Sequence, residues 1–170
     1  VYPTWDNSFD HEHFYEWVDV SIINDDVAVQ GGVTGIATVS RTNGEILSLH
    51  QGSRAYRIDS DGNTVVVGSR VQEVSVWQVV GDSLEMIGFL PRIQGVHEAV
   101  AVQDGLIAVG WRDNGVGLYN QELQLLTTIP AEDAFAVDLF ESLLVYTDDE
   151  ELVLCDVQDP SQPEEIQRVA

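Results

Sequence analysis

The chain repeats one pattern of short apolar segments four times, and this repeat limits its possible folds more than any other feature. In a first set, each apolar run ends 38, 42 and 37 residues after the previous one, at Val29, Val67, Val109 and Tyr146. In a second set, each run starts 38, 42 and 36 residues after the previous one, at Ile36, Val74, Val116 and Leu152. Because the two series keep step while the period varies, they indicate equivalent units joined by loops of variable length.

Each unit contains four strand candidates, since one more strand precedes the first run and another follows the second. The earlier strands are predicted at 18–22, 56–59, 99–103 and 135–139. The later strands are predicted at 45–49, 84–88, 123–127 and 164–167. The turns between strands are rich in glycine, asparagine and aspartate, which favour tight hairpins because they tolerate a positive φ.

Four short strands in every repeat of about 40 residues are typical of β-propeller blades, whereas a β-sandwich does not explain an in-step repeat. The sequence therefore predicts an all-β chain, a propeller-like array of four four-stranded antiparallel blades. The predicted blades span 17–54, 55–95, 96–133 and 134–170, after an N-terminal lead-in segment at 1–16.

An array of four small blades predicts uncovered apolar faces at its two ends, because such a set rarely closes into a tight ring. Three arrangements cover these faces: further blades of a larger ring, a second copy that completes an eight-bladed ring, or end-to-end assembly into filaments. We expect further blades or partner blades.

The charge of the chain is extreme, with 29 acidic residues against 7 basic ones and a net charge of -22. Nucleic acid is excluded as a partner, because phosphate binding needs clustered basic side chains. An anionic membrane is repelled, and no segment approaches the roughly 20 apolar residues of a membrane-spanning helix. The acidity fits a halophilic, salt-adapted surface or a compositional bias of the genome.

Two segments resemble known proteins of the cell exterior. Residues 152–163 read LVLCDVQDPSQP. They resemble the bacterial and archaeal surface propeller repeat named for its Leu-Val-Ile-Val-Asp core, which continues into an Asp-Pro-Ser-x-Pro turn. Residues 10–17, DHEHFYEW, are similar to the Asp-His-His-Ala-Phe segment of secreted proteins with a C-terminal β-propeller, from which Glu12 and His13 depart. The resemblance implies an extracellular or cell-envelope propeller.

Two groups of residues are candidate metal ligands. His11 and His13 share one face of an extended segment and offer two imidazoles to a transition metal, although ordinary surface histidines are the favoured interpretation. Asp59, Asp61 and Asn63 alternate around Gly62 as in short calcium-binding loops, and the competing interpretation is a plain hairpin turn. The sequence establishes no cofactor, and calcium is the one candidate.

These features favour a non-enzymatic extracellular module that binds a protein or a glycan, or assembles with further copies of itself. The sequence contains no nucleophile elbow, no phosphate-binding loop, no dinucleotide fingerprint and no lysine. The alternative is a metal-dependent propeller hydrolase or lyase, with His11, His13 and His97 near the mouth of the central channel.

Overall fold

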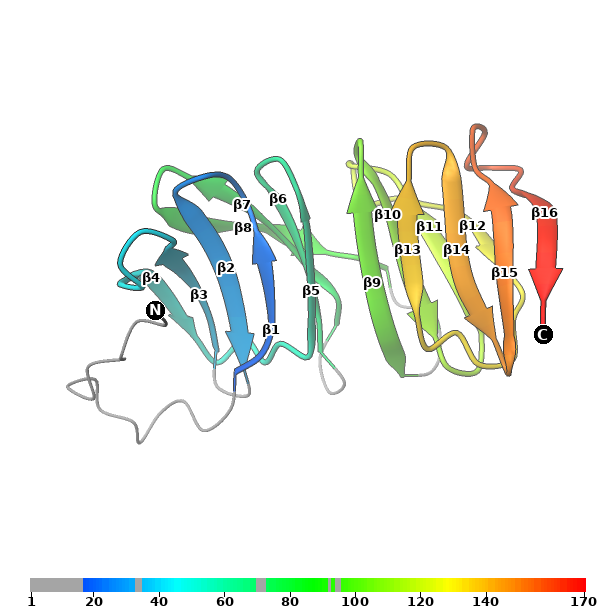
Figure 1. Cartoon of the computed structure of the whole chain (residues 1–170), viewed down its shortest axis with the longest axis horizontal. Helices are drawn as coiled ribbons and strands as arrows, with labels where there is room; N and C mark the ends of the chain where they lie inside the picture. Colours follow the sequence, from blue (N-terminus) through cyan, green and yellow to red (C-terminus); the bar gives the residue numbers. More distant parts are fainter. Residues whose placement is uncertain (1–16, 33–34, 70–72, 92, 94–95) are drawn as a thin grey trace.

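The chain folds into four β-sheets of four antiparallel strands each (Figure 1). The computed structural model describes residues 17–32, 35–69, 73–91, 93 and 96–170. Within these residues, each sheet consists of four strands that are consecutive in the chain and pair in sequence order. The prediction of an all-β array of four four-stranded antiparallel blades is therefore confirmed. No helix in the described ranges is long and apolar enough to cross a membrane.

The strands have the following bounds. Blade 1 contains β1 (Trp17–Ile22), β2 (Val27–Gly32), β3 (Gly35–Ser40) and β4 (Ile46–Gln51). Blade 2 contains β5 (Arg57–Asp61), β6 (Thr64–Gly68), β7 (Ser75–Val80) and β8 (Ser83–Phe89). Blade 3 contains β9 (His97–Gln103), β10 (Leu106–Trp111), β11 (Gly115–Tyr119) and β12 (Leu125–Ile129). Blade 4 contains β13 (Val137–Phe140), β14 (Leu143–Asp148), β15 (Glu151–Asp156) and β16 (Glu164–Val169).

The first strands of the four blades lie side by side along one line. Strand β1 contacts β5, β5 contacts β9, and β9 contacts β13. The other strands fan outward from this line, so that β4 and β16 mark opposite ends of the array (Figure 1). The four blades thus form an open arc in which β1 and β13 are the two ends of the inner row.

A β-bulge recurs at the same place in every blade. The register between the third and fourth strands shifts at Thr38/Val39, Val76/Trp77, Leu118/Tyr119 and Leu154/Cys155. A bulge increases the local right-handed twist of a sheet. The repeated bulge shows that the four blades are equivalent in backbone geometry as well as in strand order.

Strands β12 and β13 start two residues later than predicted, because side chains bind the N–H groups of the preceding backbone. The N–H of Leu123, which has a φ of 63°, donates to the Asn120 carbonyl, and the Gln124 N–H donates to Asn120 Oδ1. In blade 4, the Phe135 and Ala136 N–H groups donate to Thr147 Oγ1 at 2.9 and 3.1 Å instead of joining the sheet.

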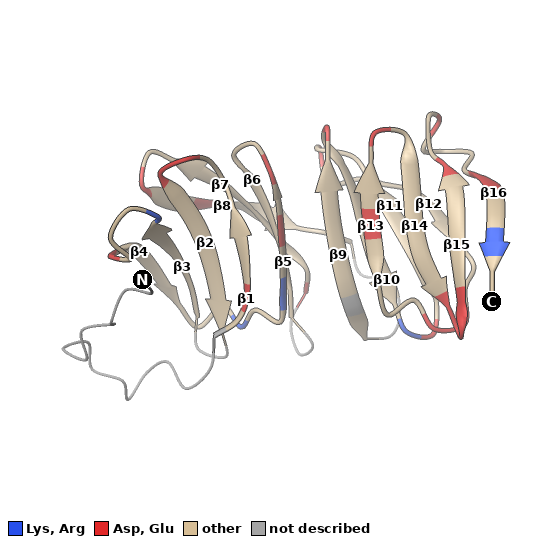
Figure 2. Ribbon diagram, in the orientation of Figure 1, with Lys and Arg blue, Asp and Glu red and all other residues tan. Residues whose placement is uncertain are grey.

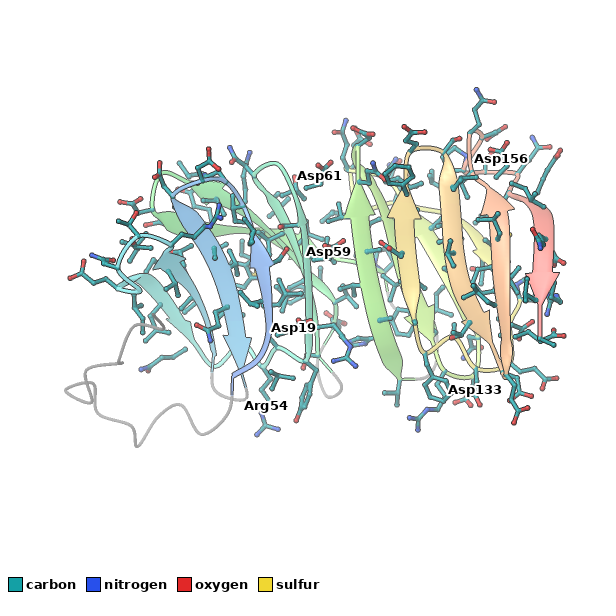
Figure 3. The ribbon with its side chains drawn as sticks, in the orientation of Figure 1. Asp19, Arg54, Asp59, Asp61, Asp133 and Asp156 are labelled. Carbon is teal, nitrogen blue, oxygen red and sulfur yellow. The ribbon has the colours of Figure 1, made fainter. Side chains whose placement is uncertain are left out.

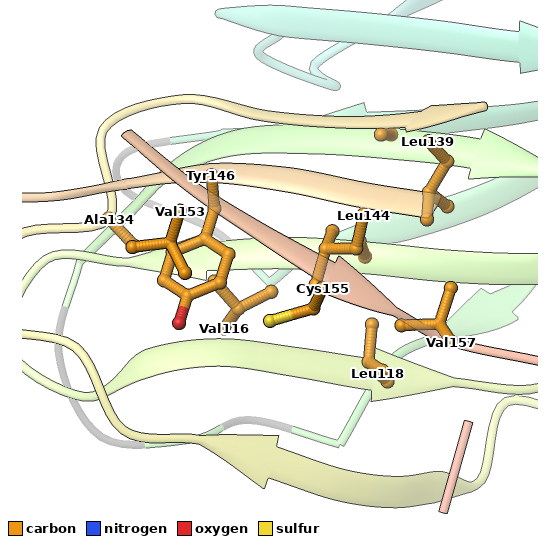
Figure 4. Close-up of a cluster of buried hydrophobic side chains, with 11 residues drawn as sticks. Val116, Leu118, Ala134, Leu139, Leu144, Tyr146, Val153, Cys155 and Val157 are labelled. Carbon is orange, nitrogen blue, oxygen red and sulfur yellow. The ribbon is translucent and has the colours of Figure 1, made fainter. Parts of the chain in front are cut away.

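The hydrophobic core is divided among the three seams between neighbouring blades. We call the side of a blade that points to the next blade its forward face, and the side that points to the previous blade its rear face. The forward faces at the seams contain Val29 and Ile36 in blade 1, Val66, Val74 and Val76 in blade 2, and Ala101, Ala108, Val116 and Leu118 in blade 3. The rear faces contain Ile58, Val65, Val67 and Trp77 in blade 2, and Val100, Val102, Ile107, Val109, Trp111 and Tyr119 in blade 3. In blade 4 the rear face contains Leu139, Leu144, Tyr146, Val153 and Cys155 (Figure 4).

An unbroken apolar run is required wherever a strand has neighbours on both sides. In β10, Ile107 packs in the seam with blade 2, whereas the next residue, Ala108, packs in the seam with blade 4. Because successive side chains of a strand point to opposite faces, both must be apolar. Acidic residues gather at the turns and on the inner strands, and leave most of the sheet surface uncharged (Figure 2).

Candidate functional site

Carboxylates on the inner strands connect each of the first two blades to the next blade. Asp19 Oδ2 accepts a hydrogen bond from the Ile58 N–H at 2.9 Å, and Asp59 Oδ2 accepts one from the Val102 N–H at 2.7 Å. Inner strands are sheet edges, so their outward N–H groups need a partner from outside the sheet. The carboxylate of one blade therefore satisfies a backbone donor of the following blade (Figure 3).

The same carboxylates also hold the backbone of their own strand. Asp19 Oδ1 accepts the N–H of the next residue, Val20, at 3.0 Å. Asp59 is bonded by the backbone of the next residue, Ser60, as well as by Val102. Burial raises the pKa of Asp59, the two backbone hydrogen bonds oppose this shift, and the charges of Asp138 and Asp19 add to it.

The residues of the predicted calcium site contribute to this seam and to a hairpin turn. Asp61 Oδ2 accepts the Asp104 N–H at 2.6 Å. Asn63 is exposed beside Gly62, and its carbonyl accepts the Val79 N–H at 2.8 Å. In the part of the chain that the structure describes, no three His, Cys, Asp or Glu side chains gather in a way that could hold a metal ion. Calcium binding at Asp59, Asp61 and Asn63 stays a prediction.

The predicted histidines divide between described and undescribed residues. His11 and His13 lie outside the described residues, so their role as metal ligands stays a prediction. His97 is buried, and its ring packs edge-on against Trp111 with ring centroids 5.4 Å apart. His50 and Trp77 form a similar pair in the seam between blades 1 and 2, with centroids 5.1 Å apart.

Asp138 repeats the arrangement of Asp59 at the far end of the array. It pairs with Val145 in the second strand of its blade, as Asp59 pairs with Val66. Its Oδ1 accepts the N–H of the next residue, Leu139, at 2.9 Å, as Asp19 Oδ1 does for Val20. Among the described residues, nothing donates a hydrogen bond to its Oδ2. Asp138 thus accepts an N–H of its own strand, as Asp19 and Asp59 do, but among the described residues it accepts no N–H of a following blade.

Alanine takes the place of this carboxylate in blade 3. Ala101 pairs with Ala108, which is the register position of Asp59 and Asp138 in their blades. The seam between blades 3 and 4 therefore contains no inner-strand carboxylate at this position, and the apolar cluster around Leu144 holds it together. The carboxylate recurs in blade 4, where no following blade exists among the described residues.

The forward face of blade 4 is apolar and uncovered, and we call it the open face. Strand pairing places Phe140 beside Leu143, Val145 beside Leu154, and Leu152 beside Val169. Phe140 is 65% exposed, Leu152 50% and Val169 48%, whereas Leu144 on the rear face of the same sheet is fully buried. Isolated soluble domains seldom expose a contiguous apolar sheet face of this kind.

The sequence interpretation predicted uncovered apolar faces at the two ends of the array, but it did not identify Asp138. One signal was available: aspartate disfavours strands, yet Asp19, Asp59 and Asp138 each occupy the middle of an inner strand. An acidic residue that recurs within the inner strands of three blades indicates a use for the carboxylate in the fold.

Comparison with known proteins shows the fold. No family model matches the chain, and no curated protein matches it, so the resemblance to the surface repeat stays a prediction. A crystal structure of the computationally designed Ika4 protein superposes with a TM-score of 0.73 and 17% identity, over 84% of this chain and 91% of that chain. The designed Ika8 protein gives a TM-score of 0.71 and 18% identity over 87% of this chain and 47% of that chain.

The structure is also similar to WD40 repeats. A crystal structure of the RRP9 WD40 repeats superposes with a TM-score of 0.76 and 14% identity, over 91% of this chain and 51% of that chain. The chain therefore spans about half the length of the Ika8 and RRP9 chains. At these identities the likeness shows the architecture alone: the chain is a four-bladed array with the β-propeller fold.

Proposed function

We propose that this chain is a non-enzymatic propeller module of the cell exterior, and that it binds a protein through the open face of blade 4. One observation carries the proposal. The rear face of blade 4 is buried against blade 3, while its forward face exposes Phe140, Leu152 and Val169 beside a carboxylate oxygen with no donor among the described residues. Such a face has the composition of a blade seam that lacks its second half.

The chemistry of the open face favours a protein as its ligand. Its centre is aliphatic, with Val145 paired to Leu154, and Phe140 is its one aromatic side chain. A flat aliphatic sheet face buries apolar side chains of another protein, and Asp138 offers an acceptor that suits a backbone N–H. The WD40 repeats of RRP9 share the propeller fold of this chain.

The proposed location rests on residues 152–163, which resemble the surface repeat. In this segment Asp159 Oδ1 accepts hydrogen bonds from the N–H and the hydroxyl of Ser161, at 3.0 and 2.6 Å, and the Asp159 carbonyl accepts the Gln162 N–H at 3.0 Å. The Asp-Pro-Ser sequence therefore closes a tight turn that leads into β16. A surface rich in carboxylates also keeps a protein hydrated at high salt.

The proposal predicts selective photo-crosslinking through the open face. A photoreactive benzoyl-phenylalanine in place of Phe140 is expected to form adducts with protein from the surface fraction of the source cells. The matched control carries the same group in place of Leu125, which is 42% exposed on the outer strand β12. Mass spectrometry identifies the adducts. The absence of protein adducts at position 140, or the same adducts at both positions, would contradict the proposed function.

A further inference from the structure

We propose that the partner of the open face is the rear face of blade 1 in a second copy of this chain, and that two copies close one ring through two identical seams. The proposal rests on the proposed function, because it names the protein that covers the same face. It follows from four features of the described residues: the carboxylate of Asp138, the amide edge of β1, the apolar side chains of both end faces, and the length of the arc.

Asp138 is arranged to accept a backbone N–H from a following inner strand. In both seams with a carboxylate at this edge, one oxygen is within hydrogen-bond distance of an N–H group in the next blade, 2.9 Å for Asp19 and 2.7 Å for Asp59. Asp138 already accepts the Leu139 N–H through Oδ1 and has its Oδ2 available. The missing donor is an outward N–H group on the edge of another inner strand.

Strand β1 offers such an edge, because no blade precedes it among the described residues. The outward Val20 N–H donates to the carboxylate of its own neighbour, Asp19, at 3.0 Å. The corresponding N–H two residues along β1 belongs to Ile22. An inner-strand edge with no preceding blade thus lies at one end of the arc, and a carboxylate with no following blade lies at the other.

The seam between blades 1 and 2 indicates which amide Asp138 would reach. Ser21 Oγ lies 2.6 Å from Ser60 Oγ, and Ser60 has the register position in β5 that Val102 has in β9. Ser21 therefore corresponds to Asp59, and Ile22 corresponds to Val102. The expected hydrogen bond between copies runs from the Ile22 N–H of one copy to the Asp138 Oδ2 of the other.

The rear face of blade 1 has side chains that complement the open face. Its inner strand exposes Val20 and Ile22, at 59% and 60%. Pairing places Leu49, which is 37% exposed, on the same face as Val20, whereas Ala37 in the middle of this face is buried. The exposed apolar side chains of the rear face are therefore those of its inner and outer strands.

The length of the arc favours a closed pair of copies over an open filament. Four blades correspond to 47% of the Ika8 chain and 51% of the RRP9 chain, so two copies supply the length of one such propeller. A head-to-tail interface forms a ring when its rotation closes. Each copy carries a net charge of -22, so repulsion opposes pairing, and salt weakens that repulsion.

Sedimentation equilibrium of the purified 170-residue chain tests the proposal. The expected species has twice the 18.8 kDa mass of the chain, and its association strengthens from about 0.15 M to about 2 M salt. Leu152→Arg places a charge in the seam and is expected to weaken association at least about ten-fold. The matched control is Met86→Arg, because Met86 and Leu152 are both 50% exposed and Met86 lies on the outer strand β8. This control is expected to leave association unchanged.

A second variant tests the hydrogen bond. Asp138→Ala is expected to weaken association without changing the circular dichroism spectrum of the monomer. A protein that stays monomeric at every concentration and salt level, or that grows beyond two copies, overturns the proposal, as does equal weakening by Leu152→Arg and Met86→Arg. If the chain is monomeric but position 140 still forms adducts with another protein, the proposed function stands and only the identity of the partner is wrong.

Discussion

Replacing Leu144 by alanine is expected to lower the free energy of unfolding by about 2 to 5 kcal/mol, as measured by urea denaturation. Leu144 is fully buried on the rear face of blade 4, in one cluster with Leu118 of blade 3 and Leu139 and Cys155 of its own blade (Figure 4). Truncation removes apolar area and leaves a cavity. This seam also lacks the inner-strand carboxylate found in the first two, so apolar packing carries more of its stability.

The matched control is Leu125→Ala, on an outer strand where Leu125 is 42% exposed. This substitution is expected to cost less than about 1 kcal/mol, because the side chain gives up little buried area. Equal losses for the two variants would show that blade 4 is not held to blade 3 through this cluster. The blades would then be connected in some other way.

Replacing Asp59 by alanine is expected to lower the free energy of unfolding by about 1 to 3 kcal/mol. The variant leaves the Val102 N–H, which now donates to Asp59 Oδ2 at 2.7 Å, without its acceptor at the seam between blades 2 and 3. Asp59→Asn keeps an acceptor oxygen at the same place, so it is expected to cost less than the alanine variant. Equal losses for the two variants would contradict a role for this hydrogen bond.

The pH dependence of the asparagine variant follows from the pKa of Asp59. Burial raises that pKa above its ordinary value of 3.8, so folding disfavours the ionised form. The stability contributed by Asp59 is therefore lowest above the folded pKa and rises as the pH falls through it toward 3.8. The free energy of unfolding of Asp59→Asn, taken relative to that of the unsubstituted protein, is expected to be higher at pH 7 than near pH 4. A difference that is constant with pH would contradict this, and Asp113→Asn on an exposed turn serves as the control.

The blade array was predictable because its signal is repeated and local. Two in-step series of apolar runs reveal four equivalent units, and uninterrupted runs such as Leu106 to Val109 indicate strands with neighbours on both sides. Strand starts were less predictable. Asn120 and Thr147 bind nearby N–H groups that a strand pattern assigns to the sheet, and this competition depends on the folded positions of their side chains.

The use of the inner-strand carboxylates was not predictable in the same way. The spacing of Asp59 and Asp61 around Gly62 suggested candidate calcium ligands or a plain hairpin turn, and neither interpretation concerned a contact with another blade. Their hydrogen bonds reach Val102 and Asp104, residues 43 positions further along the chain. No local pattern encodes such a contact, because it depends on how one blade sits against the next. The same holds for Asp138, whose partner we place in another copy.

Backbone hydrogen exchange of β1 tests most directly whether the open face meets a second copy. Exchange of the amides in Trp17–Ile22 is followed while the protein concentration is raised through the range of association. We predict that exchange of the Val20 and Ile22 amides slows as concentration rises, that β12 on the outer edge of blade 3 shows no such change, and that Asp138→Ala abolishes the slowing. Exchange of β1 that is independent of concentration would contradict the pairing of the first and fourth blades.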